Sequence, residues 1–253
     1  MEGNGTEKLL SMLISLILFF FSARPSFVLG SMNLPATTQQ VVLVETDSWT
    51  STTGELQLLS RTPGGWVAVG AKIPVSLGKN GLAWGRGLQQ EVADGPQKVE
   101  GDGKATAGVF HLGTAFGYEP GPPPGCKLPY RQATDRDFFV DDPHSADYNT
   151  WVTLPAAGWE KPWKSAETLR RTDYLYELGI VVLQNSAPVV RGKGSAVFLH
   201  IWRNPGSPTA GCTAMAKDNL QALLEWLDPA KQPLLIQAPR GEMHKIRIAD
   251  APK

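Results

Sequence analysis

The sequence is poor in the residues that build metal centres and disulfide frameworks. Its 253 residues include only two cysteines and four histidines. No two of these residues have the spacing of metal ligands within one helix or strand, so we expect no metal site and no cofactor. The cysteines, Cys126 and Cys212, could pair in an oxidising compartment. Such a bridge would occupy both thiols, and we expect them to remain free.

The chain also lacks an excess of charge of either sign. It carries 24 basic and 24 acidic residues, so it has no overall positive field that would attract a nucleic acid. Internal repeats are missing, and the only compositionally biased tract is the proline- and glycine-rich loop at residues 119–125. These absences favour one globular domain with no nucleic-acid partner.

One long apolar run is present, at residues 9–23 after Lys8. It is shorter than the roughly 20 residues that a membrane-spanning helix needs, and its length is typical of a signal-peptide core. Small residues precede Ser31, so we expect residues 1–30 to be a signal peptide. Residues 31–253 are then an exported domain of the periplasm or cell envelope, with its core at about 41–239. A retained membrane anchor is the alternative, because acidic residues weaken the positive start of the leader.

Short β-rich runs dominate the exported part and are separated by glycine- and proline-containing loops. This pattern predicts a mainly β sandwich or barrel. The predicted strands cover 41–44, 56–59, 66–69, 109–112, 138–140, 151–154, 180–183 and 196–199.

One helix is expected after Cys212, where four leucines fall at helical spacing: Leu220, Leu223, Leu224 and Leu227. Asp228 and Pro229 end it. A second, shorter helix is predicted at residues 166–171, with Ser165 as its N-cap.

The segment from Gly194 to Ala216 carries the best candidate for chemistry. An apolar strand ends in His200, a turn-forming loop follows, and a Gly-Cys pair leads to the expected helix. A cysteine at a helix N-terminus is a favoured nucleophile, because the helix stabilises the thiolate and free backbone N–H groups can hold an oxyanion. The loop allows the chain to fold back, so we expect His200 to act as base for a low-pKa Cys212.

Other readings of these residues stay open. Cys212 could be a small buried hydrophobic residue, as many lone cysteines are. His244 could serve as base in a papain-like order, although the late position of the cysteine disfavours this. His111 and His144 are expected at the periphery rather than in the site.

The residues 209–212, Thr-Ala-Gly-Cys, together with His200, resemble the catalytic motif of the L,D-transpeptidase family. A second stretch, residues 101–110, resembles the glycine-rich segment of that family, with Ala107 where a proline is usual. The family usually carries an arginine two residues after the cysteine, and here that position is Ala214. We expect Arg203 to take over the binding of the substrate carboxylate.

The resemblance implies a mainly β L,D-transpeptidase-like domain with one helix after the catalytic cysteine. It implies a cysteine acyltransferase that acts on tetrapeptide stems of peptidoglycan, with Cys212 forming a thioester and His200 moving protons. Backbone N–H groups at Cys212 and Thr213, beside Gly211, are expected to hold the oxyanion, and the Ile201 carbonyl to orient His200. A last group, Trp202 and Thr209, is expected to contact the substrate.

Two further functions are compatible with the same residues. An L,D-carboxypeptidase would differ only in releasing the thioester with water. A wall-binding module without turnover is the other, because the usual arginine is replaced by Ala214. The oligomeric state and the acceptor stay open.

The first prediction concerns export. We expect the leader to be removed near Gly30, because its length and small-residue border fit a signal peptide better than an anchor. N-terminal sequencing of the exported protein tests this. A mature chain that still starts at Met1 would make the protein membrane-anchored.

Overall fold

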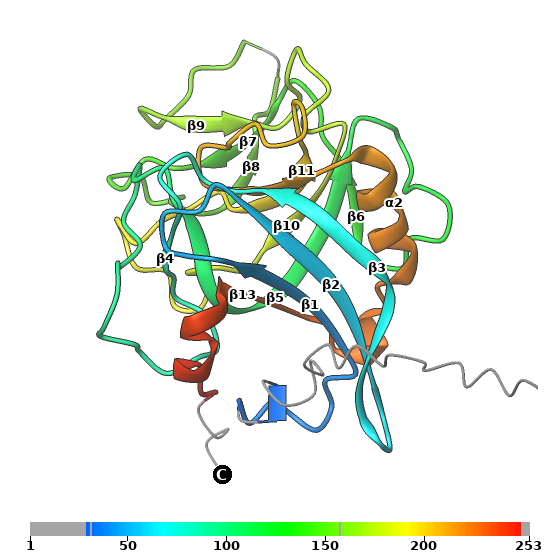
Figure 1. Cartoon of the computed structure of the whole chain (residues 1–253). Coiled ribbons are helices and arrows are strands. Elements are labelled where there is room, and N and C mark those ends of the chain that lie inside the picture. The colour runs from blue at the N-terminus through cyan, green and yellow to red at the C-terminus, as the bar shows by residue number, and fades with distance from the viewer. Residues whose placement is uncertain (1–28, 31, 157, 249–253) are drawn as a thin grey trace, which may run out of the picture.

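A computed structural model describes residues 29–30, 32–156 and 158–248, and its centre is a sheet of ten strands that closes on itself (Figure 1). The strand order is β10-β11-β12-β3-β2-β1-β13-β5-β4, and β6 pairs with β5. Since β10 also pairs with β5, the path returns to its start as a barrel. The strands are β1 (Gln40–Thr46), β2 (Thr53–Thr62), β3 (Gly65–Ser76), β4 (Leu82–Trp84), β5 (Ala105–Gly117), β6 (Tyr130–Gln132), β10 (Leu178–Val182), β11 (Phe198–Ile201), β12 (Thr213–Met215) and β13 (Leu234–Pro239).

The barrel encloses the main hydrophobic core. Helix α2 (Lys217–Trp226) packs against this core with its apolar face. The buried leucines of α2 are Leu220, Leu223 and Leu224, and they belong to the same apolar cluster as the strands. The leucine spacing therefore predicted this helix correctly, and the predicted mainly β fold with one helix after Cys212 is confirmed. Short 3-10 turns η1 (Pro229–Lys231) and η2 (Arg240–Lys245) flank β13.

A separate three-stranded sheet is inserted between β6 and β10. It is formed by β7 (Asp137–Val140), β8 (Trp151–Thr153) and β9 (Ala166–Thr168), with β7 in the middle and antiparallel to both neighbours. We call residues 133–177 the insertion. Both ends of the insertion are hydrogen-bonded to the end of β5. The N–H of Ala133 donates to the carbonyl of Gly117, the last residue of β5 (2.8 Å), and the N–H of Tyr118, the next residue, donates to the Glu177 carbonyl (3.3 Å).

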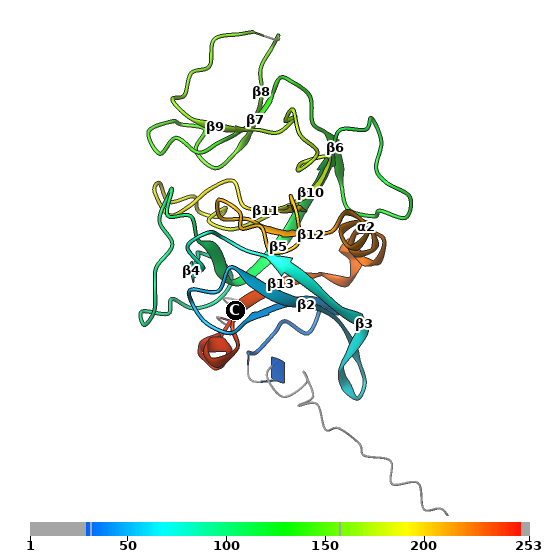
Figure 2. The ribbon, with the colours of Figure 1, turned by 45° about the horizontal axis from the view of Figure 1, so that its top comes forward.

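Aromatic rings hold the insertion against the barrel, beside β10 and β11 (Figure 2). Phe198 of β11 lies at the centre of this contact. Its ring centroid is 5.3 Å from that of Phe116 in β5, 5.2 Å from that of Phe139 in β7 and 5.5 Å from that of Tyr176. All three pairs have the edge-to-face geometry that aromatic quadrupoles favour. The insertion therefore has a fixed position over one side of the barrel.

Two local predictions are wrong. The helix predicted at residues 166–171 is strand β9, because Ala166 and its neighbours pair with β7. Cys212 does not lie at a helix N-terminus, since β12 intervenes and α2 begins only at Lys217. In both places a pairing with a distant strand overrides the local pattern. The strand predicted at 196–199 begins later, at Phe198.

The predicted leader, residues 1–30, lies almost entirely outside the described residues. Within the part of the chain that the structure describes, no helix has the length and apolar character to cross a membrane.

Candidate active site

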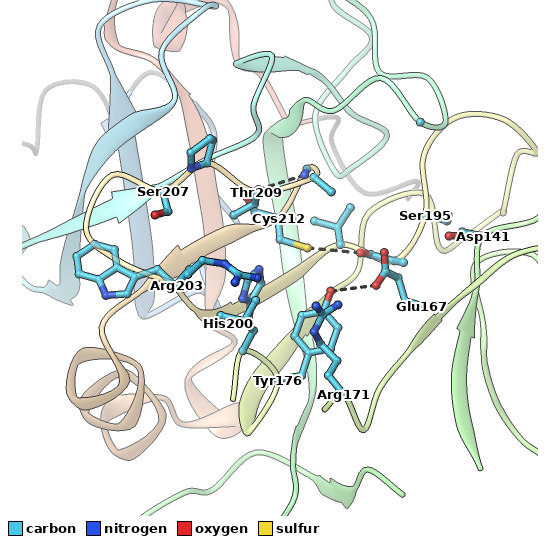
Figure 3. Close-up of a pocket in the computed structure, with 18 of the residues that line it drawn as sticks. Asp141, Glu167, Arg171, Tyr176, Ser195, His200, Arg203, Ser207, Thr209 and Cys212 are labelled. Carbon is cyan, nitrogen blue, oxygen red and sulfur yellow. Dashed lines mark hydrogen bonds between the residues drawn. The ribbon is translucent and has the colours of Figure 1, made fainter. Parts of the chain in front are cut away.

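A pocket of about 330 Å³ opens between the barrel and the insertion, and Cys212 and His200 both line it (Figure 3). The barrel side comes from β11, the loop after it and the Gly-Cys turn. The insertion side comes from the end of β7, from β9 and from the segment before β10. The sequence-predicted residues that line the pocket are Cys212, His200, Trp202, Arg203, Thr209 and Gly211.

Cys212 sits in the turn that enters β12 and is only 7% exposed. Its Sγ lies 3.6 Å from the backbone carbonyl oxygen of Ala196. Figure 3 shows the sulfur directed toward the side of the pocket where Glu167 lies. The turn requires Gly211, whose φ is +152° and whose added Cβ would lie 3.1 Å from the Lys104 carbonyl oxygen. The Gly-Cys turn therefore packs directly on the glycine-rich segment.

His200 lies in β11, next to the Gly-Cys turn. Its partner in the parallel ladder with β12 is Ala214. Its Nδ1 is 2.8 Å from the carbonyl oxygen of Ile201. A carbonyl only accepts hydrogen bonds, so this contact places the ring proton on Nδ1 and leaves Nε2 with its lone pair. The ring of Tyr176 packs edge-on against the imidazole, with centroids 5.1 Å apart.

Burial keeps both groups neutral in the free protein. It raises the pKa of the Cys212 thiol to about 12, and the charge of Glu167 adds to this effect. Burial also lowers the pKa of His200 to about 4. The expectation of a low-pKa thiol, based on His200 and a helix N-terminus, is therefore wrong for the free protein. Between these two described residues no hydrogen bond is formed, because the thiol faces Ala196 instead.

Only one of the two residues expected to supply backbone donors for an oxyanion, Cys212, lines the pocket. Thr213 does not line the pocket, and its hydroxyl donates to Oε1 of Gln237 (2.8 Å) inside the barrel. The N–H of Gly211 is directed to the hydroxyl oxygen of Thr209 (3.1 Å). Thr209 in turn donates to the Cys212 carbonyl (2.6 Å) and so braces the turn.

Position 214, where the family usually has an arginine, lies inside the sheet in strand β12. Ala214 is fully buried between β11 and β3. Arg203 reaches the pocket from the loop after β11, with a side chain that is 64% exposed and 3.8 Å from Asp173. Arg171 is a second pocket cation that sequence reasoning missed. It makes two hydrogen bonds to Asp173, of 2.8 and 2.9 Å.

Acidic side chains contribute to the insertion side of the pocket. They are Glu167 from β9 and Asp141, which follows β7 directly. A third carboxylate, Glu100, comes from the loop before β5. Nothing in the local sequence marked Glu167, because only the pairing of β7 with β9 brings it to Cys212.

The other histidines lie elsewhere. His111 is exposed on β5, His144 is exposed in the loop after β7, and His244 lies in η2; none of the three lines the pocket of Cys212. The papain-like order with His244 as base is therefore excluded. Both cysteines are free thiols. Among the described residues, no group of three histidine, cysteine or acidic side chains could hold a metal ion.

Comparison with known proteins identifies the fold family. Residues 55–236 match the YkuD family, described as the L,D-transpeptidase catalytic domain. A search of proteins with curated functions gives no match.

Solved structures give weaker likenesses. Bd1075 from Bdellovibrio bacteriovorus has 13% identity and a TM-score of 0.38, covering 85% of this chain and 55% of that chain. A mutant of the helical cell shape determining protein Pgp2 from Campylobacter jejuni has 16% identity and a TM-score of 0.38, covering 83% of this chain and 52% of that chain. The chain thus spans about half the length of these proteins.

The thiol pKa predicts how Cys212 reacts with iodoacetamide. Only thiolate is alkylated, so with a pKa of about 12 the rate should rise about tenfold per pH unit from about pH 7 to pH 10 without a plateau. A Cys126→Ser background isolates the reaction, and mass spectrometry follows it. A plateau below about pH 8 would show a thiol already ionised in the free protein.

Proposed function

Because the chain belongs to the YkuD family of L,D-transpeptidase catalytic domains, we propose that it is an exported L,D-transpeptidase that acts on peptidoglycan tetrapeptide stems. The observation that supports this best is that Cys212 and His200 line one pocket, held by neighbouring parallel strands. Thioester chemistry requires a nucleophile and a base within reach of each other, and adjacent strands can bring these two side chains together once the thiol turns away from Ala196.

The first half of the reaction forms a thioester. Sγ of Cys212 attacks the carbonyl carbon of the peptide bond that joins the diamino acid to the terminal D-amino acid. The thiol proton passes to Nε2 of His200. The C–N bond then breaks, and His200 returns the proton to the leaving amine. Because thiol and imidazole are both neutral in the free protein, the proton moves as the sulfur attacks, and not beforehand.

The second half releases the thioester. The amine of another stem attacks the carbonyl carbon and gives its proton to His200. The C–S bond breaks, and the sulfur takes that proton back, which restores the resting thiol and imidazole. Ile201 holds His200 in one tautomer throughout, since its carbonyl accepts from Nδ1. Before the attack the thiol must turn away from the Ala196 carbonyl that it faces in the free protein.

Muropeptide analysis tests the proposed function. The chain from Ser31 onward is incubated with isolated peptidoglycan, and the digested product is separated by chromatography and weighed by mass spectrometry. New dimers joined between two diamino acids are expected, and Cys212→Ala should abolish them. Trimmed stems without dimers would replace the transpeptidase by a carboxypeptidase. Unchanged peptidoglycan would contradict both the transpeptidase and the carboxypeptidase, and it would favour the wall-binding module without turnover.

Arg203 is the proposed ligand of the substrate carboxylate. Arg203→Ala should slow thioester formation with a tetrapeptide at least tenfold, because a charge-assisted hydrogen bond of ~2 kcal/mol is lost. Alkylation of Cys212 by neutral iodoacetamide should not change. Arg191→Ala is a matched control, since Arg191 is exposed and does not line the pocket. Equal acylation rates in Arg203→Ala and the wild type would move the role to Arg171.

A further inference from the structure

The side chains that line the pocket carry three cations and three carboxylates, and the total becomes negative when the carboxylates that pair with those cations are counted as well. The three cations that line the pocket already have acidic partners outside it. Lys98 pairs with Asp102 at 2.5 Å, and Arg171 and Arg203 both face Asp173. These cations are thereby engaged by groups that do not line the pocket.

The carboxylates of the pocket fall into two groups. Glu100 is fully engaged, because the hydroxyls of Tyr148 and Ser195 both donate to its Oε2. Glu167 receives only one long hydrogen bond, from the Tyr176 hydroxyl at 3.3 Å, and it forms no ion pair with a described residue. It faces the half of the pocket into which the Cys212 sulfur is directed (Figure 3).

Asp141 provides an independent observation. Its Oδ1 atom is completely buried and accepts no hydrogen bond from any described residue. A buried carboxylate oxygen without a donor is costly, so it calls for a donor that the described residues do not supply, such as a ligand, an ion or a water molecule. Burial raises the pKa of the Glu167 carboxyl, and the negative charge of the nearby Asp141 raises it further. The two carboxylates therefore share one region of the pocket. The charge of Arg171 reaches Glu167, but the hydrogen bonds of its guanidinium go to Asp173, so neither carboxylate has an ion-pair partner among the described residues.

We propose that Glu167 and Asp141 form a subsite for a primary ammonium group of the substrate. An ammonium carries one positive charge and three donors, so it can serve the free oxygen of Asp141 and the weakly bonded carboxylate of Glu167 together. The assignment rests on the function proposed for the same pocket, and it goes beyond it by naming residues of the insertion as determinants of specificity. Two amines fit this chemistry: the side-chain amine of the donor's diamino acid and the amine of the acceptor.

Charge-selective labelling of Cys212 tests the subsite without any turnover. In a Cys126→Ser background, Cys212 is modified with methanethiosulfonates that carry a 2-aminoethyl, a neutral ethyl or a 2-sulfonatoethyl group. The ratio of the cationic to the neutral rate should exceed that of a free cysteine peptide by about fivefold or more, because carboxylates without cations attract the ammonium. Mass spectrometry gives each rate.

Variants then locate the effect. Glu167→Gln and Asp141→Asn should each lower the cationic-to-neutral ratio about threefold or more. Glu167→Gln should also lower the thiol pKa, but this change cancels in the ratio because both reagents react with the same thiolate. Asp141→Asn is the safer variant for folding, because Asp141 bonds to no described residue. Glu91→Gln is the matched control, since Glu91 is exposed and lines a different cavity. A wild-type ratio equal to that of the free peptide, or unchanged ratios in both variants, overturns the subsite.

Single-turnover acylation distinguishes the two amines. If the donor amine binds, acetylating it should slow thioester formation about tenfold or more in the wild type and much less in Glu167→Gln. If the acceptor amine binds, Glu167→Gln should instead slow release of the thioester by an added amine. If acetylation does not slow thioester formation and Glu167→Gln does not slow thioester release, the subsite is contradicted. A chain that shows the labelling selectivity but forms no thioester keeps the subsite and loses the proposed function.

Discussion

The aromatic contact around Phe198 is the constraint on which the site depends. Phe198 belongs to the barrel, yet its ring packs against Phe139 of the insertion as well as against Phe116 of β5. Without this contact the barrel would still present Cys212 and His200, but the opposite wall of the pocket would lose the apolar packing that seats it on the barrel. The same cluster buries Cys212 and brings Tyr176 against His200. Packing thus determines both the shape of the pocket and the protonation of its two reactive groups.

Burial dominates the pKa values of both groups, and the local charges act on them in both directions. Lys98 and Arg171 lower the pKa of Cys212, as does the backbone N–H of Phe198, yet the thiol pKa is raised to about 12. The resting site is therefore uncharged at sulfur and imidazole, and the only unbalanced charge in it comes from carboxylates. A substrate that brings positive charge to the insertion side would reduce the contribution of Glu167 to the thiol pKa.

Sequence reasoning was successful where the information is local. The leucines of α2 and the short apolar strands can be read from nearby residues, and the motif from Thr209 to Cys212 indicated the family correctly. It failed where a partner lies far along the chain. Residues 166–171 were predicted as a helix because their pairing with β7 leaves no local trace. That error also concealed Glu167, and the wrong helix start after Cys212 led to the wrong thiol pKa.

The insertion enters and leaves the barrel at Gly117 and Tyr118, so its ends are already closed by the fold that carries it. Closing a loop at a preformed junction costs little additional entropy when the loop changes in length or sequence. The insertion, which carries Asp141 and Glu167, can therefore change in sequence or length at little entropic cost to the barrel. Exchange of residues 133–177 would change the wall of the pocket opposite Cys212 and His200 while the barrel strands that carry these two residues keep their sequence.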